Sequence, residues 1–322
     1  MIEKAVVVRR STRLEELIAR FNTREQARFY IEHAGGDFAD YELEHDNYRR
    51  GLDAVESALR PIVKVQIIDR SFLPNFVVTP DEVIITVGQD GLVANTAKYV
   101  RGAPIVAVNP DPERFDGVLL PFQVTEAGPA VRLVQERAAH VQRITMAEAT
   151  LSDGQRLLAF NDFFIGASSH VSARYRISQR GRSEEQSSSG VLVSTGAGST
   201  GWLSSVFNMA RGVAEFTGGN AGTVTRLPRD ARRLVFVVRE PFASRASGAE
   251  IVAGSVDEDT PLSIESRMPR NGVIFSDGVE TDYLAFNSGA IASIGVAREV
   301  ANLVIKGKGA KAKASTRAPR TP

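Results

Sequence analysis

Apolar positions in the first third of the chain follow two periods, one typical of buried strands and one of amphipathic helices. The β-branched run Ala5–Val8 predicts a buried strand. Thr12 stands just before apolar residues spaced three and four apart over 14–21, which predicts an amphipathic helix with a threonine cap. Because strands and helices alternate, this part should form a parallel α/β layer. The other predicted elements are strands at Ile62–Asp69, Asp81–Val87 and Pro104–Asn109, two helices within Arg24–Leu59 and a short helix at Asn95–Val100.

The pattern changes after Phe122. Apolar and polar residues now alternate over short stretches separated by Gly, Ser, Asn and Asp, which is typical of antiparallel strands. Leu203–Ala210 is the clearest helical pattern among them. The sequence therefore predicts two domains, an α/β domain at 1–122 and a β-rich domain at 123–305.

Composition is that of a globular protein with a buried core. The chain has 322 residues, of which 43% are hydrophobic and 24% charged, and its formal net charge of +1 gives no overall field that would attract nucleic acid. It has no cysteine, which excludes disulfides and thiolate metal sites. No run of about 18 apolar residues marks a membrane-spanning helix, so we expect a cytoplasmic protein without membrane or nucleic-acid partners. The segment 306–322 has six Lys or Arg and no acid, and we expect a disordered basic tail.

A glycine turn follows the apolar run that ends at Val87. Its sequence is GQDG at 88–91, and it leads into a predicted helix. Glycines at such a turn expose backbone N–H groups, and the positive end of a helix attracts phosphate. Asp90 is unusual there, because a carboxylate repels phosphate unless it accepts a proton or holds a metal. The alternative is an ordinary Asp-Gly turn with a solvated acid.

A second glycine turn lies within Val191–Ser205, again between a strand and a helix. Its hydroxyl groups and amides should converge at the helix start and could bind a phosphate or a ribose. The glycines also match the dinucleotide pattern G-x-G-x-x-G. The flanking short strands and the lack of an acid-ended strand about 20 residues later argue against a Rossmann site. A hydroxyl-rich helix cap is the plainer alternative.

Two further polar pairs interrupt apolar stretches. Asn161 and Asp162 lie among Leu and Phe residues, where an unpaired polar group would cost about 1–3 kcal/mol. A ligand's ribose hydroxyls or a strand-end turn could satisfy them. Asp277 and Gly278 primarily predict a hairpin turn. They are also a candidate for a functional site, which is the less favoured interpretation.

The order of these motifs resembles that of the NAD kinase family. The chain has GxDG at 88–91, PIVAVN at 104–109 with a downstream GVL, the Asn-Asp pair, STGAGSTGW at 194–202 and the late Asp-Gly. The family shows GGDG, a P-x-x-x-x-N strand, an Asn-Glu or Asn-Asp pair, an S-T-x-x-G-S-T-A-Tyr turn and a late Asp-Gly. The resemblance runs from about Val83 to about Ile305.

This resemblance implies the two-domain architecture of NAD kinases and diacylglycerol kinases, with the site in the cleft between an α/β N-terminal domain and a β-rich C-terminal domain. It also implies transfer of a phosphoryl group from ATP, or from polyphosphate, to the 2′-hydroxyl of the adenosine ribose of NAD, giving NADP. Mg²⁺ normally assists such a transfer. The family is usually a homodimer or homotetramer, so a homo-oligomer is expected.

The resemblance also assigns roles to single residues. Asp90 becomes the general base, which fits its chemistry because a sugar hydroxyl is a poor nucleophile and needs a carboxylate within about 3 Å. Gly88 and Gly91 frame the phosphate turn, and Asn161 and Asp162 hold the acceptor ribose. The remaining candidate nucleotide-binding residues all come from the second glycine turn: Thr195, Ser199, Thr200, Gly201, Trp202 and Ser205. No residue is assigned to a metal.

Several positions depart from the family pattern. Gln89 replaces a glycine, so its side chain must point away from the phosphates, and Leu92 replaces a threonine, which removes a hydroxyl donor. Ser189 stands where the family commonly has an aspartate near the nicotinamide end. The other departures are Gly196 for proline, Gly201-Trp202 for Ala-Tyr, and Phe242 for histidine. Recognition of nicotinamide therefore looks altered, whereas the catalytic geometry looks preserved.

Three other functions stay open at this stage. The first is a family relative that phosphorylates another hydroxyl acceptor, such as a nucleoside, sugar or lipid. The second is a nucleotide-binding sensor that kept the fold without turnover. The third is a Rossmann oxidoreductase built on the G-x-G-x-x-G turn.

Overall fold

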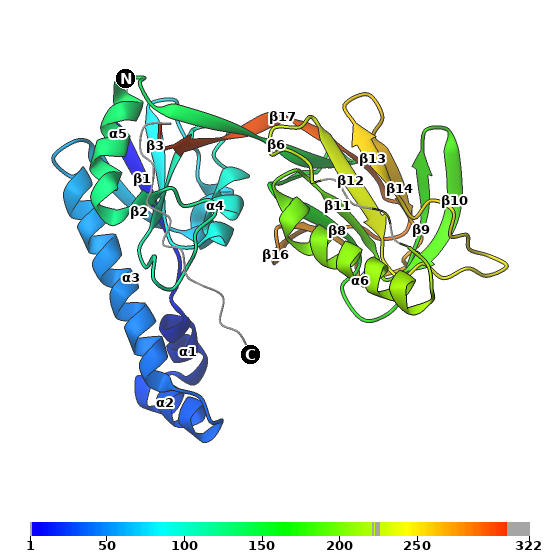
Figure 1. Cartoon of the computed structure of the whole chain (residues 1–322), viewed down its shortest axis with the longest axis horizontal. Coiled ribbons are helices and arrows are strands. Elements are labelled where there is room, and N and C mark those ends of the chain that lie inside the picture. The colour runs from blue at the N-terminus through cyan, green and yellow to red at the C-terminus, as the bar shows by residue number, and fades with distance from the viewer. Residues whose placement is uncertain (1, 221, 223–225, 308–322) are drawn as a thin grey trace.

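The chain folds into two parts that lie side by side and are joined by two long strands (Figure 1). The structure is a computed structural model and describes residues 2–220, 222 and 226–307. An α/β part carries a projecting arm of helices, and the second part is β-rich with one helix on its surface. The two-part organisation matches the change of pattern in the sequence.

The α/β part is built on parallel strands in the order β2–β1–β3–β4. All residues of the strand that precedes the GQDG turn are buried, because helices cover both faces of the sheet. The predicted parallel α/β layer is confirmed. Its strands are β1 (Lys4–Arg9), β2 (Lys64–Asp69), β3 (Glu82–Val87), β4 (Pro104–Asn109) and the short β5 (Phe122–Gln123), with a 3₁₀ turn at Arg70–Asn75.

Alternate residues of the central strand pack against different helices. Val83 and Ile85 share a core with one pair of helices, and Ile84 lies in the core on the opposite face. The first face is covered by α3 (Phe38–Leu59) and α5 (Ala127–Gln135), and the second by α4 (Asp90–Ala97).

Two predicted boundaries differ from the structure. Helix α4 begins at Asp90 rather than near Asn95, so the glycine turn runs directly into the helix. Helix α5, which the alternation pattern did not predict, follows a 3₁₀ turn at Val124–Glu126 and packs in the core of the α/β part. The α/β part therefore extends to about residue 135, beyond the expected boundary at 122.

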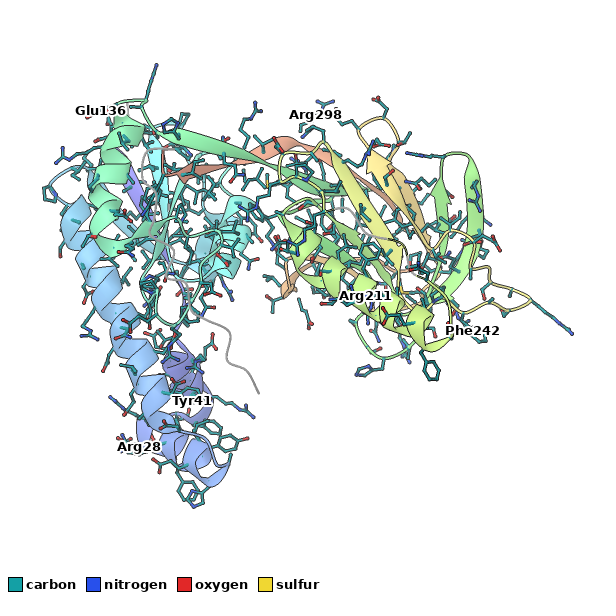
Figure 2. The ribbon with its side chains drawn as sticks, viewed as in Figure 1. Arg28, Tyr41, Glu136, Arg211, Phe242 and Arg298 are labelled. Carbon is teal, nitrogen blue, oxygen red and sulfur yellow. The ribbon has the colours of Figure 1, made fainter. Side chains whose placement is uncertain are left out.

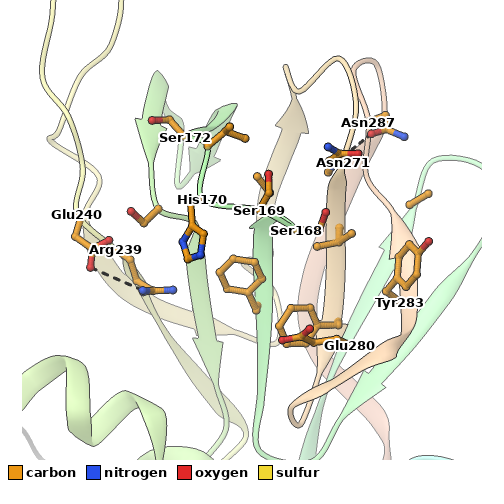
Figure 3. A pocket seen from close by; sticks show the side chains of 18 of the residues that line it. Ser168, Ser169, His170, Ser172, Arg239, Glu240, Asn271, Glu280, Tyr283 and Asn287 are labelled. Atoms are coloured by element: carbon orange, nitrogen blue, oxygen red, sulfur yellow. Dashed lines mark hydrogen bonds and ion pairs between the residues drawn. The ribbon is translucent and has the colours of Figure 1, made fainter. Parts of the chain in front are cut away.

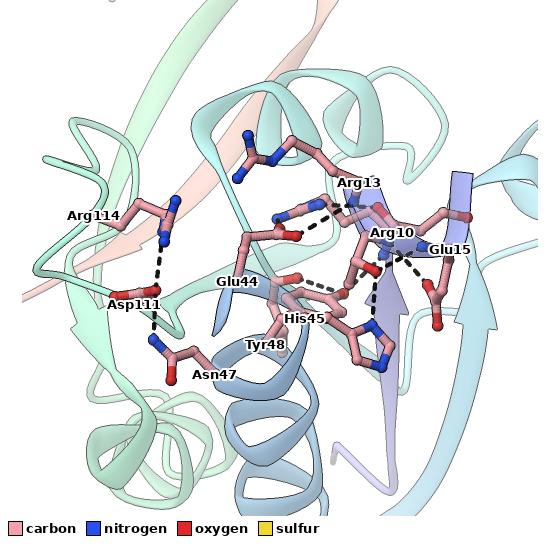
Figure 4. A network of polar contacts seen from close by, with 12 residues as sticks. Arg10, Arg13, Glu15, Glu44, His45, Asn47, Tyr48, Asp111 and Arg114 are labelled. Carbon is pink, nitrogen blue, oxygen red and sulfur yellow. Dashed lines mark hydrogen bonds and ion pairs between the residues drawn. The ribbon is translucent and has the colours of Figure 1, made fainter. Parts of the chain in front are cut away.

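The arm consists of α1 (Arg13–Phe21), α2 (Arg24–His33) and the first half of α3. Thr12 caps α1 as predicted, and Glu15 completes a capping box. A network of polar contacts joins the base of the arm to the carboxyl ends of the strands (Figure 4). In it, Tyr48 Oη accepts from the Arg10 amide at 2.9 Å and donates to the carbonyl of Val87 at 3.1 Å.

The β-rich part consists of two sheets packed face to face around one core. Helix α6 (Trp202–Phe216) covers the outer face of the second sheet. The first sheet has β6 (His140–Leu151), β7 (Arg156–Ala159), β9 (Ala173–Gln179), β10 (Arg182–Ser188), β14 (Leu262–Ser266) and β17 (Ile291–Ile305). The second has β8 (Asp162–Ala167), β11 (Val191–Ser194), β12 (Arg233–Val238), β13 (Ala253–Asp257), β15 (Gly272–Ser276) and β16 (Val279–Ala285).

Strands β6 and β17 belong to both parts. They pair with each other along their length, and the far end of β17 also pairs in parallel with β4 through Asn302 and Leu303. One hydrogen-bonded sheet thus continues from the α/β part into the β-rich part. This continuity fixes how the ends of the strands face each other across the space between the two parts.

No helix in the described ranges is long and apolar enough to cross a membrane. The expected disordered tail lies outside the described residues, apart from Lys306 and Gly307. The ammonium of Lys306 forms an ion pair with Glu126 at 2.6 Å.

Candidate active site

A cavity of about 330 Å³ lies between the two parts of the molecule. It receives the first residues of two helices, α4 and α6, and their positive N-terminal ends favour an anionic ligand. The lining residues come from six separate segments of the sequence. They are Asp90, Gly91, Val118, Leu119, Asn161, Asp162, Ala197, Gly198, Thr200, Gly201, Trp202, Arg229 and Asp277.

The carboxylate of Asp90 has a fixed orientation at this cavity. Its Oδ1 accepts from the amide of Leu119 at 2.7 Å and its Oδ2 from the amide of Val118 at 3.2 Å. These two donors fix the carboxylate of a half-buried side chain in one orientation. The GVL segment quoted with the family resemblance thus has a physical role, because its amides hold Asp90.

Asn109, the last residue of the P-x-x-x-x-N strand, shapes the loop that supplies those amides. Its side chain donates to the carbonyl of Phe115 at 2.9 Å and accepts from the amide of Asp111 at 3.0 Å. Gly117 passes over it with φ 66°, and a Cβ there would lie 2.8 Å from the Asn109 side-chain nitrogen. Only glycine fits this left-handed, crowded position.

Asp277 is the centre of the polar structure on the other side of the cavity. Its side chain is fully buried and accepts from the amides of Phe160, Asn161 and Asp162 at 3.0, 2.6 and 3.3 Å. Burial raises the pKa of Asp277, and the Lys98 ammonium and these amides oppose that rise. The late Asp-Gly is therefore more than a hairpin turn, because its carboxylate holds the Asn-Asp pair.

Lys98 connects this carboxylate to the helix that carries Asp90. Its ammonium, whose side chain is only 1% exposed, lies 2.8 Å from Ser276 Oγ and 3.7 Å from Asp277 Oδ2. Burial lowers the pKa of Lys98, and Asp277 opposes this shift. A second bond from the same end of α4 runs from the Tyr99 hydroxyl to Asp282. Helix α4 is thus fixed to the β15–β16 hairpin.

The carbonyls of the Asn-Asp turn hold the second glycine turn. Thr195 Oγ1 donates to the carbonyl of Phe160 at 2.6 Å and accepts from the amides of Ala197 and Gly198 at 3.1 and 3.3 Å. The Thr195 amide donates to the carbonyl of Asn161 at 2.8 Å. Thr195 is fully buried and organises the turn rather than lining the cavity.

Close backbone approach explains the glycines of this turn. A Cβ on Gly196 would lie 1.9 Å from the carbonyl oxygen of Pro228, and one on Gly198 would lie 2.2 Å from that of Asn161. The preceding strand β11 is antiparallel to both of its neighbours. The G-x-G-x-x-G match therefore arises from packing and not from a parallel dinucleotide-binding unit.

Seven of the eleven predicted site residues line the cavity: Asp90, Gly91, Asn161, Asp162, Thr200, Gly201 and Trp202. Besides Thr195, three others do not line it. Gly88 is buried beside Leu92, Ser199 donates to the carbonyl of Gly196 at 2.7 Å, and Ser205 lies exposed on α6. Sequence reasoning missed Lys98 and Arg229, since no local pattern marks them. It noted the GVL segment but gave its amides at 118 and 119 no role.

Trp202 also borders a larger cavity of about 830 Å³ on the outer face of β8 and β15 (Figure 3). The indole ring stacks on Phe164 with centroids 5.8 Å apart, and the Arg239 guanidinium lies over it at 5.3 Å. Ser189 lines this cavity. Phe242 is 65% exposed at the periphery of the β-rich part and lines neither cavity (Figure 2).

The environment of Asp162 favours its protonated form. Burial raises the pKa of Asp162 to about 7, and the nearby Asp277 adds to the rise. Among the described residues no group of three or more His, Asp or Glu has the arrangement of a metal cage. The cavity thus combines a fixed, half-buried carboxylate with hydroxyls, amides and two helix N-termini. These are the parts that phosphoryl transfer to a hydroxyl requires.

Known proteins that are similar to this chain carry the names of kinases. No family model matches the chain. NAD kinase 2, mitochondrial, from Rattus norvegicus is 24% identical over 372 aligned residues, which cover 92% of this chain and 85% of that protein. The protein of the same name from Homo sapiens is also 24% identical, with 92% and 82% covered.

Solved structures show the same fold. An NAD kinase from Archaeoglobus fulgidus in complex with ATP has a TM-score of 0.56 at 16% identity and covers 94% of this chain and 93% of its own. Yeast NADH kinase complexed with NADH has a TM-score of 0.56 at 14% identity, with 96% and 85% covered. The expected two-domain fold is confirmed. The chain is thus similar in sequence to NAD kinases and shares their fold over more than nine tenths of its length.

Replacing Lys98 by Met should leave the Asp277 carboxylate buried without its cation. Breaking a buried pair in this way costs about 3–5 kcal/mol, so the free energy of unfolding in urea should fall by that amount. Lys306→Met is the matched control, because its ion pair is partly exposed and its loss should cost less than about 1 kcal/mol. Equal stability of the two variants would show that the Lys98 pair is not needed.

Asp162 should make stability depend on pH. Its pKa of about 7 lies above the ordinary value of 3.8, so between these pH values the folded state binds more protons at this site than the unfolded state. Stability relative to Asp162→Asn should therefore fall as pH rises from 4 to 7, by a few kcal/mol at most, since one pKa unit equals about 1.4 kcal/mol. Chemical denaturation of both proteins at several pH values measures this difference. A difference that stays constant across this range would contradict the assignment.

Proposed function

We propose that this protein transfers a phosphoryl group from ATP, or from polyphosphate, to the 2′-hydroxyl of the adenosine ribose of NAD, giving NADP. The proposal rests on one observation. The Asp90 carboxylate, held by two amides, lines the same small cavity as Asn161, Asp162 and Thr200. A base and a set of ribose-binding groups therefore face one space between the two domains.

The roles of the residues follow from this geometry. The acceptor ribose is held by Asn161 and Asp162, whose backbone is fixed by Asp277. Asp90 orients the hydroxyl and takes its proton as the ribose oxygen bonds to phosphorus and the bond to ADP, or to the shortened polyphosphate, breaks. Thr200, Gly201 and Trp202 contact the adenosine, with the indole as a stacking surface.

Phosphoryl transfer also needs neutralisation of the donor's charge, which Mg²⁺ supplies when bound. Mg²⁺ is usually held by one or two carboxylates together with substrate phosphates and water. Asp90, together with Asp162 in its ionised form, would supply the carboxylates of such a partial ligand set. The N-terminal ends of α4 and α6 add positive potential at the same place.

The acceptor could also be another hydroxyl compound. Ser189 and Trp202 stand where the family commonly has an aspartate and a tyrosine, and both line the larger cavity next to the candidate site. This change concerns recognition of the part of the acceptor remote from the reacting hydroxyl. Homo-oligomerisation and a cytoplasmic location remain predictions, and the two sequence relatives are named as mitochondrial proteins.

The direct test is an assay of the purified protein for NADP formation from Mg²⁺-ATP and NAD. Polyphosphate as donor, and NADH, nucleosides, sugars and lipids as acceptors, are tested in parallel. NADP formation supports the proposal. ATP consumption with only another acceptor favours the second kinase function, and binding of nucleotides without any turnover favours a sensor.

Asp90→Asn should keep the shape of the turn and remove the base. Turnover should fall by roughly 10²–10⁴, and nucleotide binding should be largely retained. Asp116→Asn is the matched control, because Asp116 lies exposed in the neighbouring loop and does not line the cavity. Unchanged turnover in Asp90→Asn would exclude Asp90 as the base.

A further inference from the structure

The charges on the wall of the 330 Å³ cavity are unbalanced for a nucleotide ligand. Three of the described residues that line it are acids, namely Asp90, Asp162 and Asp277, and one is a cation, Arg229. The buried Lys98 is paired with Asp277 and does not line the cavity. Of the three acids, Asp277 is compensated by Lys98, and Asp162 favours its protonated form. A polyphosphate chain brought here would therefore meet the Asp90 carboxylate and one guanidinium.

The backbone around Arg229 is fixed on two sides. Its carbonyl accepts from the amide of Thr145 on β6 at 2.9 Å. The preceding residue, Pro228, packs its carbonyl against Gly196, so closely that no Cβ would fit there. The glycine that replaces the family's proline thus makes room for the segment that carries Arg229 to the cavity.

The two arginines that follow in the sequence, Arg232 and Arg233, have other partners. Arg232 pairs with Glu258 and donates to the carbonyl of Ala297 at 2.8 Å. Arg233 pairs with Asp257 at 2.6 Å. Within the described part of the chain, the structure records no hydrogen bond or ion pair for the guanidinium of Arg229, which is half-buried at the cavity. A cation in this position is available to a ligand.

We propose that Arg229 contacts a phosphate of the nucleotide bound in this cavity. This inference rests on the proposed function and adds a residue to it. Guanidinium groups bind phosphate through two parallel hydrogen bonds and keep their charge at all relevant pH values. Arg229 offsets the repulsion between the phosphates and the Asp90 carboxylate. It also stabilises the negative charge on the transferred group, as arginine does in other phosphotransferases.

The phosphate belongs either to the donor or to the diphosphate of NAD, and kinetics separates the two. Arg229→Ala should lower kcat/KM by roughly 10²–10³, the usual cost of losing one charge-stabilising donor. Arg229→Lys should recover part of this loss. A raised KM for ATP alone identifies the donor, and a raised KM for NAD alone identifies the acceptor. Arg233→Ala is the matched control, because it removes an exposed arginine of the same segment.

Two further readouts separate contact with the ligand from a structural effect. Added guanidinium ion should partly restore turnover to Arg229→Ala and leave Arg233→Ala unchanged. The chain has one tryptophan, and Trp202 lines the cavity, so its fluorescence reports nucleotide binding directly. Titration with ATP and with NAD should show weaker binding of one nucleotide to Arg229→Ala.

Wild-type turnover with unaltered kinetics and binding in Arg229→Ala would overturn this inference and leave the proposed function intact. Absence of NADP formation by the wild type would overturn the proposed function, and the fluorescence titrations would still test Arg229. If the alanine variant does not fold, Arg229→Gln replaces it. Equal binding by Arg229→Gln and Arg229→Lys would then contradict a charge contact.

Discussion

The buried carboxylate of Asp277 is the group on which the geometry of the site depends. An ionised carboxylate without water contact is strongly unfavourable unless it is hydrogen-bonded and paired. Here three consecutive amides and the Lys98 ammonium compensate it. The amides belong to the Asn-Asp turn and the ammonium to α4. One carboxylate therefore fixes both the residues expected to hold the acceptor ribose and the helix whose other end carries Asp90.

The contacts continue from this centre into the rest of the cavity wall. The Asn-Asp turn holds Thr195 through its carbonyls, and Thr195 in turn holds the amides of Ala197 and Gly198. On the opposite wall, Asn109 shapes the loop whose amides hold Asp90. Hydroxyls and amides that look like ligand groups in the sequence are thus divided in two sets. One set builds the turns, and the other is left facing the cavity.

Three departures from the family pattern, at positions 89, 92 and 196, have physical explanations in the structure. The side chain of Leu92 is buried in the core of the α/β part, so apolar packing replaces the missing hydroxyl. Gln89 is the N-cap residue of α4 and does not line the cavity. Gly196 admits the backbone of Pro228 and so places Arg229 at the site. In this structure Asp90 is held by the amides of Val118 and Leu119, and none of these three positions takes part in those contacts.

The sequence by itself determined the buried strands, the capped helix after Thr12, the β-rich second half and the motif order that resembles NAD kinases. These features depend on local periodicity and on short-range turn chemistry, which can be recognised from neighbouring residues in the sequence. Helix α5 was missed because its short apolar stripe resembles the alternation of strands, and only packing against the α/β core distinguishes it. The tertiary structure alone decided which polar groups meet. Lys98 and Asp277 are 179 positions apart by their numbers, and Arg229 reads as part of a surface charge run. Their roles depend on burial and on long-range contacts, and neither produces a recognisable pattern in the local sequence.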